Sequence, residues 1–220
     1  MATSFSSKRH SILPPISQAG PKPPIQFSSS ITIADSALLT GSHTITIRTE
    51  SVVHPRARLD SSGGRITIGR RCIIHERSLI GAAPGGGLPT TPSRTSSLLA
   101  PPREGVEEET AAGPAGVTLG DYVTVEVAAS IEAGDTVVGE GTVLGVGARI
   151  GTGAVIGKHC TLTPHTIVAA GDVIPDFTVI YSNGTRRTDR RGVADLRNKG
   201  QARQIEVLRR MIPSNPAKFQ

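Results

Sequence analysis

Branched aliphatic residues recur at every sixth position along much of this chain. In the segment VLGVGARIGTGAVIGKHCTLTPHTIV (143–168) they are Leu144, Ile150, Ile156, Leu162 and Val168. An amphipathic helix repeats about every 3.6 residues and a half-buried strand about every 2, so a period of six indicates neither. Val138 extends this series at its start, and Ile174 and Ile180 extend it at its end. The same spacing occurs in four further series: Leu119, Val125 and Ile131; Ile68, Ile74 and Ile80; Ile47, Val53 and Leu59; and Ile33 and Leu39.

A second restriction accompanies the first. Four residues after the aliphatic, the side chain is short at almost every unit, with Asp172 as the exception. These positions hold Ala37, Ser51, Ala57, Cys72, Ser78, Val123, Ala129, Thr142, Ala148, Ala154, Cys160, Thr166 and Thr178. Glycine often follows the aliphatic directly, as in Gly139 and Gly145. We interpret each unit as one short strand plus a corner, with the aliphatic pointing inward, the short residue where faces converge, and glycine accommodating the corner backbone.

Three such units make a coil of about 18 residues, and coils stack at about 4.8 Å, the spacing of strands in a sheet. Stacked coils bury a continuous aliphatic core, which suits a chain with only 3% aromatic residues. The pattern resembles the hexapeptide-repeat, left-handed parallel β-helix superfamily. The resemblance implies an all-β fold of left-handed coils followed by a C-terminal α-helix, and we expect about six coils between Ile31 and Tyr181.

The periodic segments divide the chain into three parts. Residues 1–29 are rich in Ser and Pro and are predicted to form a disordered tail. Residues 30–182 are predicted to form the β-helix, interrupted at 84–116 by a Pro-, Gly-, Ser- and Thr-rich segment that we expect to be a disordered loop. Residues 183–220 form a basic segment with a helix at about 195–212.

The predicted helix has one apolar stripe. Its members are Ile205, Leu208 and Ile212, extended by Leu196 and Ala202. We expect Asp195 to cap the start of the helix and Pro213 to end it. The stripe is predicted to pack along one face of the prism, with the arginines facing outward.

Positive charge is concentrated near the C-terminus. The whole chain carries a net charge of +6, and residues 184–220 hold ten basic residues against three acidic ones. Such a segment can dock on phosphate or on an acidic protein surface. No aromatic residues alternate with the arginines, so we expect no nucleic-acid partner. We also expect no membrane insertion and no secretory signal, because no apolar run of the required length occurs.

Histidines raise the question of a metal site. His54 and His75 each follow an inward aliphatic residue one coil apart, so they are predicted to stack as an exposed pair. The carbonic-anhydrase branch of the superfamily holds zinc with three histidines shared across a trimer interface. His159 and His165 lie many coils away on different faces, so no third ligand is placed. We expect no metal, and a γ-type carbonic-anhydrase-like protein stays open as an alternative.

The acyltransferase branch of the superfamily needs a basic histidine near a coenzyme A thiol in a homotrimer groove. Many members also close the β-helix with a Gly-x-Pro-Ala turn, which the segment YSNGTRR (181–187) lacks. His43 is the nearest candidate for the histidine. Cys72 and Cys160 occupy inward positions, where burial raises the pKa of a thiol and favours a packing role. We therefore expect no catalytic or cofactor-binding residues and not an enzyme, with a homotrimeric acyltransferase as the other open alternative.

Segments at both ends of the periodic region resemble the dynactin subunit 6 family. They are TIRTESVVHPRARL (46–59), IPDFTVIYSNGTRR (174–187) and IEVLRRMIPSNPAKF (205–219). The resemblance implies a non-catalytic scaffold subunit of the dynactin pointed-end complex, in the cytoplasm and cytoskeleton, that supports dynein-driven microtubule transport and cargo or adaptor attachment. The implied partners are dynactin subunit 5, dynactin subunit 4 and an actin-related protein, so we expect a hetero-oligomer. The arginines expected to contact a partner are Arg186, Arg187, Arg209 and Arg210.

Overall fold

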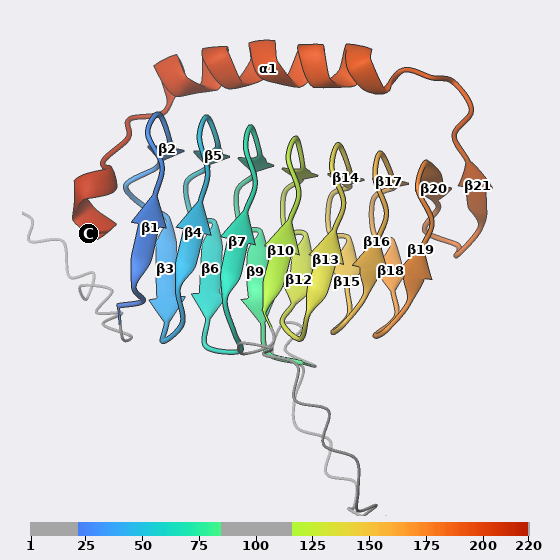
Figure 1. Cartoon of the computed structure of the whole chain (residues 1–220), viewed down its shortest axis with the longest axis horizontal. Coiled ribbons are helices and arrows are strands. Elements are labelled where there is room, and N and C mark those ends of the chain that lie inside the picture. The colour runs from blue at the N-terminus through green and yellow to red at the C-terminus, as the bar shows by residue number, and fades with distance from the viewer. Residues whose placement is uncertain (1–21, 85–115, 220) are drawn as a thin grey trace, which may run out of the picture.

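The computed structural model describes residues 22–84 and 116–219. Almost all of the loop expected at 84–116 lies outside these residues, as do residues 1–21 of the expected tail. The described residues form an elongated prism of three sheets, with one long helix lying along its length (Figure 1).

Each sheet is one face of the prism and takes one strand from each successive coil. Sheet A contains β1 (Ile25–Phe27), β4 (Ile45–Ile47), β7 (Ile66–Ile68), β10 (Val117–Leu119), β13 (Thr136–Val138), β16 (Val155–Ile156) and β19 (Val173–Ile174). Sheet B contains β2 (Thr32–Ile33), β5 (Val52–Val53), β8 (Ile73–Ile74), β11 (Thr124–Val125), β14 (Val143–Leu144), β17 (Thr161–Leu162), β20 (Thr178–Ile180) and β21 (Arg186–Thr188). Sheet C contains β3 (Leu38–Gly41), β6 (Arg58–Ser61), β9 (Leu79–Ala82), β12 (Ser130–Glu132), β15 (Arg149–Ile150) and β18 (Ile167–Val168).

The strands pair in parallel, apart from the antiparallel pair of β20 and β21. Strands β1 to β18 make six coils of three strands each, and β19 and β20 begin another. The predicted fold of about six stacked coils is therefore confirmed.

The sixth-residue aliphatics form one inward ladder on each face. On sheet B, for example, Val125 pairs with Leu144, and Leu144 pairs with Leu162. Each of these three side chains is at most 1% exposed. Because every inward residue packs between equivalents above and below it, the core is a column of aliphatic side chains that needs no large rings.

The β-helix begins earlier than the sequence pattern predicts. Residues 1–29 are expected to form a tail, but β1 pairs with β4 in register. Phe27 lies six residues before Ile33 and packs against the core. The pattern missed this first rung because a phenyl ring fills the position that an aliphatic side chain fills in later coils.

The corner backbone follows a rule that the sequence did not reveal. The third residue after an inward aliphatic adopts the left-handed conformation at Glu50, Arg71, Tyr122, His159 and Phe177, among others. The glycines directly after the aliphatics serve a different purpose from the one expected. A Cβ atom at Gly145 would lie 2.5 Å from the carbonyl oxygen of Leu162 in the next coil. Those glycines are therefore required by the close approach of stacked backbones.

The short residues at the corners form hydrogen-bonded ladders. Ser51 Oγ donates to the carbonyl of Gly69 at 2.8 Å, and Thr142 Oγ1 donates to the carbonyl of Gly157 at 2.9 Å. Buried polar groups need such partners, because an unsatisfied one costs about 1–3 kcal/mol. Because these carbonyls accept the hydroxyl hydrogens, Ser and Thr can occupy buried corner positions that Ala fills in other coils.

Helix α1 (Ala194–Met211) covers the outer face of sheet B and confirms the predicted C-terminal helix (Figure 1). Ile205 is buried against Val52 and Ile73, and Leu208 and Ile212 pack beside it. Two expectations about the helix are wrong. Asp195 does not cap it, because the cap residue is Val193 and makes no side-chain hydrogen bond. Leu196 does not extend the buried stripe, because it is 69% exposed.

The C-terminal segment fastens both ends of the prism. Arg197 at the start of α1 donates to Thr161 Oγ1 in a late coil. After α1, Ser214 Oγ accepts a hydrogen bond from the Ile33 amide at 3.0 Å. The final 3₁₀-helix η1 (Pro216–Phe219) brings Phe219 against the core beside the first coil. At the opposite end, β21 covers the edge of β20.

Candidate interaction surfaces

The three faces of the prism differ in what they present outward. Sheet B is covered by α1, which runs from Thr161 in a late coil to Val52 in an early one (Figure 1). Sheet C presents a mixed outward row, in which Arg58 and Arg149 are exposed and Ile167, paired with Arg149, is 72% exposed. Sheet A carries an uncharged rank of outward residues in register, which we call the sheet A rank. Its members are Gln26, Thr46, Thr67, Thr118, Val137, Val155 and Val173.

The sheet A rank becomes apolar toward the C-terminal end. Val137 is 38% exposed, Val155 39% and Val173 65%. Apart from Gln26, every member is Thr or Val, so the side chains extend about equally far from the sheet. Seven rungs at about 4.8 Å spacing make the rank about 29 Å long. A flat, uncharged, β-branched surface of this kind can pack against another flat face without burying a charge.

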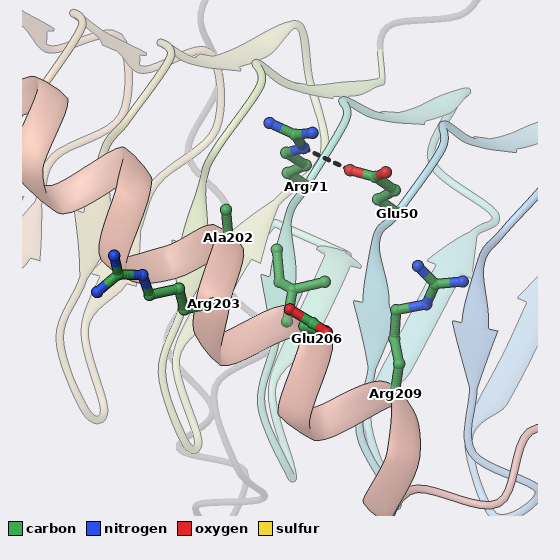
Figure 2. Close-up of a pocket in the computed structure, with 7 residues that line it drawn as sticks. Glu50, Arg71, Ala202, Arg203, Glu206 and Arg209 are labelled. Atoms are coloured by element: carbon green, nitrogen blue, oxygen red, sulfur yellow. Dashed lines mark hydrogen bonds and ion pairs between the residues drawn. The ribbon is translucent and has the colours of Figure 1, made fainter.

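A groove of about 460 Å³ runs between α1 and the corner that joins sheets A and B. Glu50 and Arg71 contribute from the corner, and Arg203, Glu206 and Arg209 contribute from the helix. Figure 2 shows Arg209 extending toward the corner that holds the ion pair of Glu50 and Arg71, whereas Arg203 points away. Arg71 also donates to the hydroxyl of Tyr122, so its position is fixed from two sides.

The structure does not bring the four predicted partner-contact arginines together. Arg186 and Arg187 lie in β21 at the late end of the prism, where Arg186 pairs with Asp172 and Arg187 lies over the ring of Tyr181. Arg209 and Arg210 lie in the last turn of α1, near the first coils. The four residues therefore belong to two separate surfaces.

Sequence reasoning missed a carboxylate that organises the turn into α1. The side chain of Asp189 is 7% exposed and accepts hydrogen bonds from Arg191 and Arg197. The bonds from Arg191 hold the pKa of this carboxyl well below its usual range. The signal was the Asp-Arg-Arg sequence at 189–191, which we interpreted only as part of the basic segment.

His54 and His75 stack as predicted, but they are half-buried, not exposed. His54 Nε2 is buried without a hydrogen-bond partner. Burial lowers the pKa of His54, the neighbouring His75 lowers it further, and Glu76 acts in the opposite direction. Within residues 22–84 and 116–219, no three His, Cys, Asp or Glu side chains lie together in an arrangement that could hold a metal ion.

The other three histidines among the described residues sit at separate corners. His43 Nδ1 donates to the carbonyl of Ser61 at 2.8 Å. His159 stacks on Phe177 with ring centroids 5.3 Å apart, and His165 lies over Gly147.

Both cysteines are buried in the corner ladders. Cys72 Sγ donates to the carbonyl of Gly120 at 3.1 Å, and Cys160 Sγ donates to the carbonyl of Pro175 at 3.2 Å. Burial raises the pKa of the Cys72 thiol to about 12 and also raises that of Cys160. These surroundings agree with the packing role expected for both residues.

No protein-family model and no curated protein matches the chain. Solved structures do match it. A hexapeptide transferase family protein of Anaplasma phagocytophilum is 12% identical, with a TM-score of 0.55, over 86% of this chain and 97% of its own. A Bacillus cereus protein named as an acetyltransferase is 16% identical, with a TM-score of 0.61, over 85% of this chain and 92% of its own. The fold is the left-handed parallel β-helix.

The comparison also corrects one expectation. The expectation that the chain is not an enzyme is contradicted, because the solved structures that share its fold carry transferase names. That expectation rested on a missing turn motif and on histidines without a clear place, and such absences do not exclude a catalytic site. In the described part of the chain, no helix has the length and apolar character needed to span a bilayer.

Proposed function

We propose that this chain is an assembly subunit of a dynactin-type pointed-end complex and that the sheet A rank packs against a partner solenoid. The proposed partners are dynactin subunit 5, dynactin subunit 4 and an actin-related protein. The proposed setting is the cytoplasm and cytoskeleton, in support of dynein-driven transport and of cargo or adaptor attachment. The resemblance of the early coil and of the C-terminal segment to the dynactin subunit 6 family supports this assignment.

The observation that carries the proposal is the contrast between the three faces. The sheet A rank is uncharged, in register and partly exposed, whereas sheet B is covered and sheet C presents Arg58 and Arg149. Neighbouring rungs lie at about the same spacing in every parallel β-helix, so a second solenoid offers a matching flat face.

The capped ends of the prism also favour side-by-side packing over end-to-end stacking. Phe219 packs against the core beside the first coil, and β21 pairs with the free edge of β20. A partner strand would have to displace these elements before it could extend sheet B. The sheet A rank is accessible without any such rearrangement.

The test is affinity capture of the full chain from native lysate, with quantitative mass spectrometry of the three proposed partners. Wild type should recover all three. Val155→Glu places a charge in the apolar C-terminal part of the sheet A rank, between Val137 and Val173, and should reduce recovery about tenfold or more. Ser130→Glu, at an outward position on sheet C, should leave recovery unchanged. Absence of all three partners from the wild-type capture would contradict the proposal.

A second candidate, an acyltransferase, is favoured by the neighbours' names and by His43. Because His43 Nδ1 donates to the carbonyl of Ser61, the lone pair lies on Nε2, which makes the half-buried ring an oriented candidate general base. An acyltransferase should form a homotrimer by native mass measurement and consume an acyl-coenzyme A. His43→Gln should then abolish turnover, while His165→Gln should retain it. A chain that is not trimeric and leaves acyl-coenzyme A intact contradicts this candidate.

A further inference from the structure

Helix α1 has a second apolar stripe on the side facing away from the prism. Leu196 is 69% exposed, Val207 55% and Met211 72%. At 3.6 residues per turn, these three side chains fall within a sector of about 60°. Ile205, which is 3% exposed, points to the opposite side of the helix. We call the three exposed residues the outer stripe.

Basic side chains border the outer stripe along one side. Lys199, Arg203 and Arg210 are exposed and occupy the adjoining sector of the helix. Arg210 pairs with Glu206 one turn earlier at 2.8 Å. In the described part of the chain, Lys199 and Arg203 make no ion pair. The edge of the stripe therefore carries unpaired positive charge.

The helix that carries the outer stripe is held in place along its length. Gln201 Nε2 donates to the carbonyl of Arg71 at 2.9 Å, and Ile205 is buried against sheet B. Beyond the helix, the Asn215 amide donates to the carbonyl of Ile33. A surface that is already ordered loses little conformational entropy on binding, so the outer stripe is organised in advance for a partner.

We propose that the outer stripe of α1 binds an acidic amphipathic helix of a partner protein. The apolar side of that helix covers Leu196, Val207 and Met211, and its carboxylates meet Lys199 and Arg203. Gly200 lies between Leu196 and Val207, and no atom lies within 4 Å of where its Cβ would be. A partner helix can therefore approach the backbone closely at this point, while the flexible Met211 side chain adapts to its surface.

A helical partner fits this surface better than an anionic membrane does. Helices that lie in a bilayer interface use a broad apolar side with Trp, Phe and Leu, and they sink about 5–10 Å into it. The outer stripe has three apolar residues and no aromatic one. Because α1 is fastened to the prism, it also cannot turn its buried side toward lipid. The outer stripe is distinct from the sheet A rank. The proposal for the outer stripe can therefore be tested independently of the proposed function.

The test is photo-crosslinking in cells from the full chain, with a photo-reactive amino acid at position 207 and a matched control at position 149 on sheet C. We expect position 207 to crosslink to a protein segment that maps to an acidic, helical stretch, and position 149 not to do so. Arg203→Glu should lower the yield at position 207 about tenfold. Val155→Glu, which disrupts the sheet A rank, should leave that yield unchanged.

Each remaining outcome overturns the proposal. These outcomes are no crosslink from position 207, a crosslink to lipid, a crosslink to a basic or non-helical segment, and a yield that does not change in the Arg203→Glu variant. Circular dichroism of the variants should match wild type, because Arg203 is exposed and position 207 is more than half exposed.

Discussion

His54 and His75 lie against each other across two successive coils, with ring centroids 4.6 Å apart and ring planes inclined at 31°. His54 Nε2 has no hydrogen-bond partner, and burial together with His75 lowers the pKa of His54 below 6.5. These surroundings therefore favour a neutral imidazole at His54 in the folded chain.

The burial of His54, with His75 beside it, makes stability depend on pH. The unfolded chain binds a proton at His54 more readily than the folded chain does, so the free energy of unfolding should be constant above about pH 6.5 and fall as the pH drops below it. The measurement is urea denaturation at a series of pH values. His54→Gln should flatten the slope below pH 6.5, whereas His165→Gln, which faces no second imidazole, should keep it. An identical slope in wild type and His54→Gln would contradict the assignment.

The glycines after the inward aliphatics should tolerate no side chain. Gly145→Ala would place a Cβ 2.5 Å from the carbonyl oxygen of Leu162. We expect a loss of about 1–3 kcal/mol in the free energy of unfolding, as in other overpacked sites. Gly200→Ala lies in the helix with open space around it. It should instead raise the free energy of local opening of α1 by about 0.5–1 kcal/mol, which slows amide exchange there. Equal effects at both positions would contradict the close approach of stacked backbones.

Ile205 should contribute strongly to the attachment of α1 to the prism, because it is the buried side chain of the helix. Ile205 fills the contact with Val52 and Ile73. Ile205→Ala should weaken that contact by about 2–5 kcal/mol, the usual loss for a buried isoleucine. Hydrogen exchange would then show residues 194–211 exchanging faster while the coils stay protected. Val207→Ala, at an exposed site on the same helix, serves as the control and should stay within about 0.5 kcal/mol of wild type.

The coils could be predicted from the sequence because their physics is local and repetitive. Leu144 occupies the same environment as Val125 and Leu162 in the neighbouring coils. The same packing constraint therefore recurs in every coil and produces the repeat in the sequence. The corner positions of Cys72 and Cys160 followed from the same repeat.

Features that occur once could not be predicted in this way. Phe27 fills the first rung with a ring that the aliphatic pattern does not include. Leu196 is a different case: it lies nine residues before Ile205, which places it on the opposite side of the helix, so helical periodicity alone would have excluded it from the buried stripe. Asp189 depends on a turn that brings Arg191 and Arg197 around it.

The candidate surfaces were the least predictable part. We predicted partner contacts at Arg186, Arg187, Arg209 and Arg210 because the excess of basic residues in this segment is visible in the sequence. The sheet A rank contains only common residues such as Thr118 and Val155, and its character comes from their alignment across coils. That alignment depends on coil length, which changes along the prism: Ile25 pairs with Ile45, a step of 20 residues, and Val137 pairs with Val155, a step of 18.

The most direct test of the account is to mix the purified chain with purified dynactin subunit 5 and to measure native mass and amide exchange together. The account predicts a one-to-one heterodimer in which the amides of β13, β16 and β19 gain protection, and the loss of that complex in Val155→Glu but not in Ser130→Glu. A homotrimer that ignores dynactin subunit 5, or a heterodimer whose new protection falls on sheet C, would contradict it.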